Sequence, residues 1–316
     1  LLHRGGRGRA PGLSRHLTRP EPPRTSLFAP LSHIDPWGVC ERRCATAERH
    51  RGPSTGCPRA REPPITRTSR AVGRAPGQSD RMPRTPLPDD LPLAFPFGHA
   101  RAAGVGEGRL RGTDFRRPFY GVRSRLPLVV PADASEAERQ RARIIRAAFE
   151  YAERMAPGEF FSHATAAILW GAAVPYLANE AIHVGVLHPH RLPRARGVRG
   201  HQARAHLTRV VVHPETGLPV ASPATAWAML GAAMMHPYDI VAVGDSLVRI
   251  QRMPGPWARR MPPPIASRHQ LETAARAGRR VGGPALRAAL PRLRTGAASR
   301  PESWTRLTIC DSGLPE

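Results

Sequence analysis

The sequence predicts an α+β protein, with an N-terminal winged helix followed by a mixed α/β domain, and with a long disordered N-terminal extension. Three observations predict this class. The first 84 residues are rich in proline and have no hydrophobic period, whereas helical and extended patterns alternate from Asp89 onward. The first patterns of that second region follow the order helix, turn, helix, strand, which is the order of a winged helix. A chain of 316 residues has room for about two domains.

Residues 1–84 are expected to be the disordered, arginine- and proline-rich extension. Prolines interrupt every short apolar run, so the segment cannot bury enough surface to offset the entropy of ordering it. The chain starts with leucine, and Met82 stands just before the first patterned sequence. We interpret residues 1–81 as upstream sequence that is not native coding sequence. The alternative is a real arginine-rich tail that binds nucleic acid.

The formal net charge of +24 comes from arginine alone, because the sequence contains no lysine. A GC-rich genome favours arginine over lysine, so the number of arginines is a weak indicator of nucleic-acid binding. The charge still attracts polyanions. The prediction of nucleic-acid binding therefore depends on where the arginines cluster in the sequence.

The cysteines and the apolar runs exclude two other classes of protein. Cys40, Cys44, Cys57 and Cys310 have neither the density of a disulfide framework nor the spacing of a zinc ribbon. The longest apolar stretch, residues 224–235, is shorter than the roughly 20 residues that a bilayer requires. We expect a cytoplasmic protein without a membrane partner.

A winged-helix-like DNA-binding domain is expected at residues 89–130. Residues 97–105 and 106–111 indicate two short helices, and residues 115–123 indicate an extended basic and aromatic segment. Guanidinium groups on a short helix can pair with guanine edges, and those on a wing can contact phosphates. The alternative is that these arginines only solvate the face of a small domain. The predicted DNA-binding residues are Arg101, Arg109, Arg111, Arg116, Arg117 and Arg123.

The mixed α/β domain is expected at residues 135–292. Its strongest pattern is a helix over 135–154, which Ser135 caps and Glu138 completes as a capping box. In a later helix, Asp245 is expected to face solvent or a partner. The other expected helices are 162–171, 223–234, 237–249, 271–277 and 284–290, and the expected strands are 182–187, 198–201 and 210–213.

Several histidines suggest a metal site, but their spacing in the sequence does not support one. His163 follows a serine at a helix start, where helix capping and packing explain it better than catalysis does. The spacing of the later histidines matches no HExxH or CxxC pattern, and a polar strand edge with partly protonated imidazoles explains them better. We therefore expect no metal and no cofactor. These later histidines are His183, His188, His190, His201, His206 and His213.

Several of these segments resemble a known family. They are residues 97–123, the sequence FSHATAA at 161–167 with Trp170-Gly171, GLPVASP at 217–223 and VGDSLVR at 243–249. They resemble an actinobacterial group that is similar to the antitoxin of type IV abortive-infection toxin–antitoxin systems. The resemblance covers residues 89–316. It implies a DNA-binding transcriptional regulator that represses its own promoter and neutralises a nucleotidyltransferase-type toxin.

The C-terminal segment, residues 299–316, resembles the start of a domain like the very-short-patch-repair endonucleases. That resemblance makes Glu302 a possible remnant of a nuclease site. The aspartate and the acidic-x-lysine pair that complete such a metal site do not appear. We expect no catalytic residue and no enzyme activity in this chain. One alternative is the targeting part of a truncated endonuclease-like protein, with metal-dependent cleavage if the missing domain is present; another is an interaction protein without nucleic-acid contact.

Overall fold

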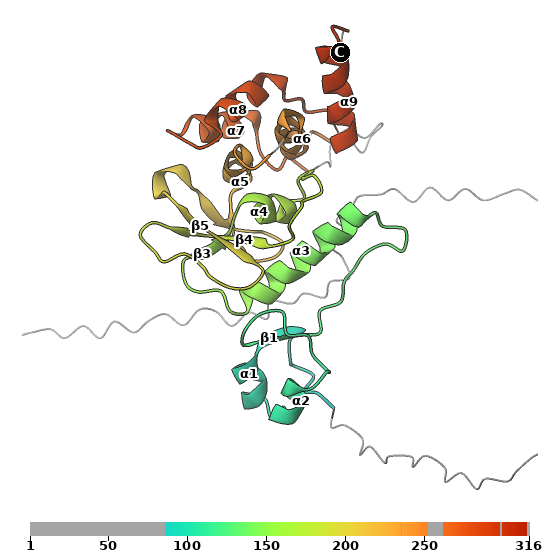
Figure 1. The fold of residues 1–316 in the computed structure, drawn as a ribbon, viewed down its shortest axis with the longest axis vertical. Coiled ribbons are helices and arrows are strands. Elements are labelled where there is room, and N and C mark those ends of the chain that lie inside the picture. Colours follow the sequence, from blue (N-terminus) through green and yellow to red (C-terminus); the bar gives the residue numbers. More distant parts are fainter. Residues whose placement is uncertain (1–85, 235, 252–261, 298, 315–316) are drawn as a thin grey trace, which may run out of the picture. The chain divides into compact units, whose positions relative to one another are not determined.

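The computed structural model describes residues 86–234, 236–251, 262–297 and 299–314, which mix helices with two sheets (Figure 1). The mixed α/β composition that the sequence predicts is confirmed. The extension predicted at residues 1–84, with Met82 and three of the cysteines, lies outside the described residues. None of the described helices is long and apolar enough to cross a membrane.

The first described elements are β1 (Ala94–Pro96), α1 (Phe97–Ala102), α2 (Glu107–Arg111) and β2 (Val122–Ser124). Both short helices lie where the sequence predicts them, whereas β1 was not predicted. β1 pairs antiparallel with β2, with Phe95 opposite Arg123. A small core holds these elements together, and it consists of Leu91, Phe95, Ala100, Val105, Leu110 and Phe115.

The long helix α3 (Glu136–Ala152) follows, and its predicted capping box is confirmed. The Ser135 hydroxyl accepts the backbone N–H of Glu138, and the Glu138 carboxylate accepts the backbone N–H of Ser135 at 2.7 Å. Near its C-terminal end, α3 contacts the residues that precede β2. The rings of Phe119 and Tyr151 meet edge to face, with 5.2 Å between their centroids.

A five-stranded mixed sheet has the order β5-β4-β3-β7-β6. β3 is antiparallel to β4 and parallel to β7, β4 is parallel to β5, and β6 is antiparallel to β7. The strands predicted at 182–187, 198–201 and 210–213 are confirmed, and β3 and β7 were not predicted. The strands are β3 (Glu159–Phe161), β4 (Ile182–Leu187), β5 (Val198–Ala203), β6 (Val210–Val212) and β7 (Pro219–Ala221).

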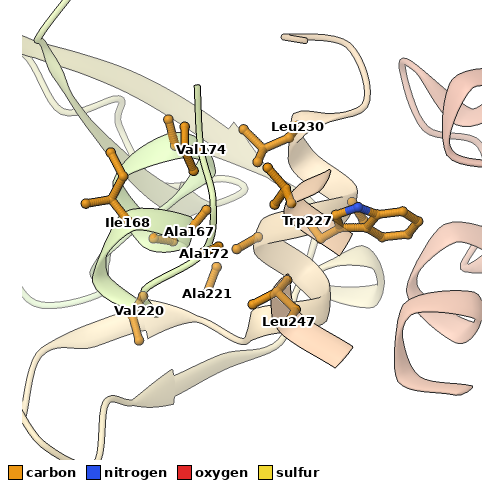
Figure 2. Packing of buried hydrophobic residues seen from close by; sticks show 14 of the residues in the cluster. Ala167, Ile168, Ala172, Val174, Val220, Ala221, Trp227, Leu230 and Leu247 are labelled. Atoms are coloured by element: carbon orange, nitrogen blue, oxygen red, sulfur yellow. The ribbon is translucent and has the colours of Figure 1, made fainter. Parts of the chain in front are cut away.

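Helix α4 packs against the sheet, and further helices lie beyond it (Figure 1). Figure 2 shows the core of this arrangement, where side chains of α4, β7, α5 and α6 face one another. The indole N–H of Trp227, which is fully buried, donates to the carbonyl of Ile240 at 2.9 Å. The helices are α4 (His163–Leu169), α5 (Pro223–Leu230), α6 (Pro237–Val248), α7 (Arg268–Arg276), α8 (Gly283–Ala289) and α9 (Arg300–Asp311), with 3₁₀ turns at Ala205–Leu207 and Leu290–Arg292.

The prediction that Asp245 faces solvent or a partner is wrong, because its side chain is fully buried between α6 and α9. Its carboxylate accepts hydrogen bonds from the Arg294 backbone N–H at 2.7 Å, the Ser303 hydroxyl at 2.7 Å and the Arg306 guanidinium at 2.9 Å. Burial raises the pKa of Asp245, and these donors oppose the rise. The sequence pattern of α6 indicated an exposed Asp245, but helix α9 covers this polar position.

Helix α9 packs on α6 and belongs to the same hydrophobic core, to which it contributes Leu307 (Figure 1). Asp239 of α6 accepts hydrogen bonds from the side chains of Arg300 and Trp304. Residues 299–314, the described part of the segment predicted as the start of a separate domain, are thus joined to the α/β domain by buried polar and apolar contacts.

Candidate nucleic-acid interface and histidine cluster

Three of the predicted DNA-binding arginines lie close together in the structure. Arg111 comes from the last turn of α2, Arg117 from the loop before β2, and Arg123 from β2 itself. Burial lowers the pKa of Arg123, and the charges of Arg117 and Arg111 lower it further. The charges of Arg117 and Arg111 therefore lie near Arg123, and Arg111 is also paired with Glu107. We call these three residues the arginine patch.

An aromatic side chain lies in the same loop, and the sequence reasoning did not select it. The Tyr120 side chain is 93% exposed, and the next residue, Gly121, has a φ of 76° that turns the chain toward β2. The Gly121 carbonyl accepts the backbone N–H of Phe97 at 2.7 Å, which fixes the turn on α1. A tyrosine followed by glycine and flanked by arginines was the signal that could have identified it.

Two of the predicted arginines pair with carboxylates that are themselves poorly exposed. Arg109 pairs with Asp114 at 2.9 Å. Arg116 pairs at 2.6 Å with Glu150 of α3, whose side chain is only 2% exposed. These contacts give both arginines a structural role, because a buried carboxylate needs a partner.

The remaining predicted arginines differ in how firmly they are held. Arg123 donates to the carbonyl of Leu110 at 2.6 Å and lies over the Phe97 ring. Arg111 makes an exposed pair with Glu107 one helical turn away. Arg117 makes a long hydrogen bond of 3.3 Å to a backbone carbonyl, and Arg101 lies exposed in the last turn of α1. The exposed guanidiniums are available to exchange these weak contacts for phosphate.

Glu302, the possible remnant of a nuclease site, lies exposed in the first turn of α9. Its backbone N–H donates to the Ser299 hydroxyl, which caps the helix. The described residues form one group of three or more side chains that could hold a metal ion, and this group contains neither Glu302 nor any other carboxylate. Among the described residues, therefore, no acidic metal site surrounds Glu302.

That group consists of His163, His183 and His201, and we call it the histidine cluster. The three residues offer ligand nitrogens that all lie within 4.8 Å of one another. His183 Nδ1 and His201 Nε2 are 2.9 Å apart, and the rings of His163 and His201 stack with 3.8 Å between their centroids. All three side chains are half-buried.

The strand register explains why His183 and His201 meet. β4 and β5 run parallel, with Gly185 opposite His201. His183 is two residues before Gly185, and residues two apart lie on the same face of a sheet. His163, the first residue of α4, reaches the same face from the helix that packs against β4. Spacing along the chain does not reveal this group because its members come from three elements.

The prediction of partly protonated imidazoles is wrong for His183 and His201. Burial, together with the neighbouring imidazoles and Arg199, lowers the pKa of His163 to about 2. Burial and the charges of His201 and Arg199 lower the pKa of His183 to about 4, and burial and Arg199 lower that of His201 to about 4. All three rings are neutral at pH 7, and the neutral imidazole is the form that binds metals.

No family model matches the chain, and no curated protein matches it. The chain is similar to a solved structure, the crystal structure of the Rv2827c protein from Mycobacterium tuberculosis, with 17% sequence identity and a TM-score of 0.39. The alignment covers 69% of this chain and 76% of that one.

Proposed function

We propose that the chain is a DNA-binding transcriptional regulator that contacts DNA through the arginine patch. The observation that carries the proposal is the proximity of Arg111, Arg117 and Arg123, whose charges repel one another in the free protein. A phosphate backbone relieves that repulsion and releases counterions on binding. The patch comes from a short helix, from a strand and from the loop between them, and a helix and a wing are the elements that a winged helix presents to DNA.

The position of Tyr120 supports the same proposal. Its ring is exposed in the loop between Arg117 and Arg123. Exposed aromatic rings among arginines stack on bases or insert at a groove, whereas the arginines hold the backbone. We assign Arg109 and Arg116 to ion pairs that stabilise the protein, and the arginine patch, Tyr120 and Arg101 to the DNA. In line with the family resemblance, we propose the protein's own promoter as the site and a nucleotidyltransferase-type toxin as a further partner.

Fluorescence anisotropy with promoter and scrambled duplexes, over a series of salt concentrations, tests the proposal. Arg111→Ala should weaken promoter binding by about 1–3 kcal/mol if the side chain contacts a base edge. Arg117→Ala should weaken binding to both duplexes and lower the salt slope by about 1. Tyr120→Ala should cost about 1–3 kcal/mol if the ring stacks on a base.

Arg276→Ala is the matched control. Arg276 forms an i,i+4 pair with Glu272 and is 68% exposed, against 70% for Arg111 in its pair with Glu107. Both variants lose one positive charge and one exposed helical ion pair, but Arg276 lies in α7. Equal losses of affinity for the two variants, or equal binding of promoter and scrambled duplexes by the unmodified chain, would contradict the proposal.

A further inference from the structure

The histidine cluster has a geometry that the packing of a core does not require. Its rings come from α4, β4 and β5, and their ligand nitrogens lie within 4.8 Å of one another. In a tetrahedral site with Zn–N bonds of about 2.0–2.1 Å, ligand nitrogens are about 3.3 Å apart. The distance of 2.9 Å between His183 Nδ1 and His201 Nε2 is close to that value. Small rotations of the rings can therefore direct three lone pairs at one point.

The backbone at His163 is held in an unfavourable conformation. Its φ of 47° lies in the left-handed region. Among the residues that the structure describes, no other non-glycine residue has a positive φ. Residues in such strained conformations cluster at functional sites. Here it positions the imidazole over His201. The strained residue, His163, is the one that α4 contributes to the cluster.

A buried hydroxyl orients the His163 ring. The Ser162 hydroxyl lies 3.1 Å from His163 Nδ1, and Ser162 is fully buried. When Nδ1–H donates to this hydroxyl, Nε2 carries the lone pair that a metal requires. Hydrogen bonds of this kind fix the tautomer of histidine ligands in metal sites.

We propose that His163, His183 and His201 bind one divalent transition-metal ion, with zinc the best match to three imidazole ligands. The described residues place no carboxylate in the group, which disfavours magnesium and calcium because these ions prefer oxygen ligands. Three protein ligands leave the fourth position of a tetrahedral ion for a small molecule.

Arg199 determines what occupies that fourth position. It is exposed, it lies opposite His183 in the pairing of β4 with β5, and it is two residues before His201 on the same face of β5. A positive charge this close disfavours a bare cation, whereas it favours an ion that carries an anionic ligand. Arg199 also lines a surface hollow with Arg194 and Val198. The fourth ligand is therefore a small anion, either hydroxide or a phosphate or carboxylate group.

Metal titrations of the full, tag-free chain, after treatment with a chelator, test the site. Calorimetry with Zn²⁺ should give one site per chain, and Co²⁺ should produce the visible absorption bands of tetrahedral cobalt. The thiolate-to-cobalt charge-transfer band should be absent, which separates this site from the cysteines. A folded chain that binds no Zn²⁺ and gives no tetrahedral Co²⁺ spectrum would overturn the proposal without any variant.

Substitutions then assign the ligands. His163→Asn keeps a residue that tolerates positive φ, and His183→Gln and His201→Gln remove the other two imidazoles. Each should weaken Zn²⁺ binding at least tenfold, with circular dichroism confirming that the variant is folded. His190→Gln, an exposed histidine of the same region, is the control and should bind as the unmodified chain does. Equal weakening by His190→Gln would show adventitious surface binding and overturn the assignment.

Inorganic phosphate tests the role of Arg199. Low concentrations of phosphate should tighten Co²⁺ binding by the unmodified chain and change its visible spectrum. Arg199→Gln should bind Co²⁺ more tightly in the absence of phosphate and should lose the effect of phosphate. If phosphate acts equally on both proteins, Arg199 does not position the fourth ligand.

Discussion

Arginine has different roles in the two regions of this molecule. In the α/β domain, arginine side chains link separate elements: Arg141 donates to the carbonyls of Ala172 and Val174, and Arg268 donates to those of Leu290 and Leu293. Burial lowers the pKa of Arg141, and the charge of Glu138 opposes this effect. Between α2 and β2, in contrast, the guanidiniums of the arginine patch lie beside one another.

This difference shows that the net charge of +24 is not in itself a nucleic-acid signal. A part-buried arginine that donates to backbone carbonyls, as Arg141 does, is less available to a polyanion than an exposed arginine such as Arg111 or Arg117. In the arginine patch, the neighbouring charges that lower the pKa of Arg123 are those of Arg117 and Arg111. Substitutions in the two regions should therefore change different properties, and the following predictions test that separation.

The largest effect is expected at Asp245, in the interface between α6 and α9. Asp245→Ala should lower the free energy of unfolding by about 3–5 kcal/mol, because it leaves the Arg306 guanidinium without its buried carboxylate. Urea denaturation monitored by circular dichroism measures the loss. Glu272→Ala, which removes an exposed helical ion pair, is the control and should change stability by less than about 0.5 kcal/mol.

A smaller loss of stability is expected at the contact between the loop before β2 and α3. Arg116→Ala leaves the Glu150 carboxylate buried without its ion-pair partner, which should cost about 1–3 kcal/mol. The salt slope of DNA binding should not change. Arg117→Ala, at the next position, should show the reverse: a lower salt slope and nearly unchanged urea denaturation. If both variants lower the salt slope equally, Arg116 contacts DNA as well, and the division of roles fails.

The pH dependence of stability should report on His213, which is buried at the end of β6. Its Nδ1 accepts the backbone N–H groups of Glu215 and Thr216, and burial lowers its pKa. The unfolded chain therefore takes up a proton more readily than the folded one. The stabilisation is complete above the ordinary histidine pKa of about 6.5, and it falls by at most about 1.4 kcal/mol per pH unit below it.

The comparison of the unmodified chain with His213→Gln isolates this contribution from that of the histidine cluster. Urea denaturation at pH 7.5 and 5.5, in the presence of a chelator, should show a smaller loss of stability on acidification for the variant. Identical losses for the two proteins would mean that His213 does not change its protonation on unfolding.

The smallest effect is expected at Glu302, which lies exposed in the first turn of α9. Glu302→Gln should change the free energy of unfolding by no more than about 1 kcal/mol, because the interaction of an exposed first-turn carboxylate with the helix dipole contributes about this much. Plasmid DNA incubated with Mg²⁺ or Mn²⁺ should stay intact with both proteins. Cleavage by the unmodified chain that Glu302→Gln abolishes would instead establish the truncated-endonuclease alternative.

Local chemistry was enough to predict much of the fold. The capping box of Ser135 and Glu138 involves residues three apart, so the helix start could be identified from the sequence alone. The strand at Ile182–Leu187 was predictable for a similar reason, since apolar residues alternate along it at Ile182, Val184 and Val186. The proximity of Arg111, Arg117 and Arg123 was also within reach, because a short loop connects their elements.

The tertiary structure decided the rest. His183 and His201 are 18 residues apart in the sequence, and their side chains come together because β4 and β5 pair in one register. A shift of that register by one residue would move His201 to the other face of the sheet. Asp245 and Ser303 are 58 residues apart, and they meet only because α9 packs on α6. A hydrophobic pattern shows which face of a helix is apolar, but it does not show that a second helix covers a polar position. The histidine cluster and the buried carboxylate depend on such long-range contacts, so neither could be read from spacing along the chain.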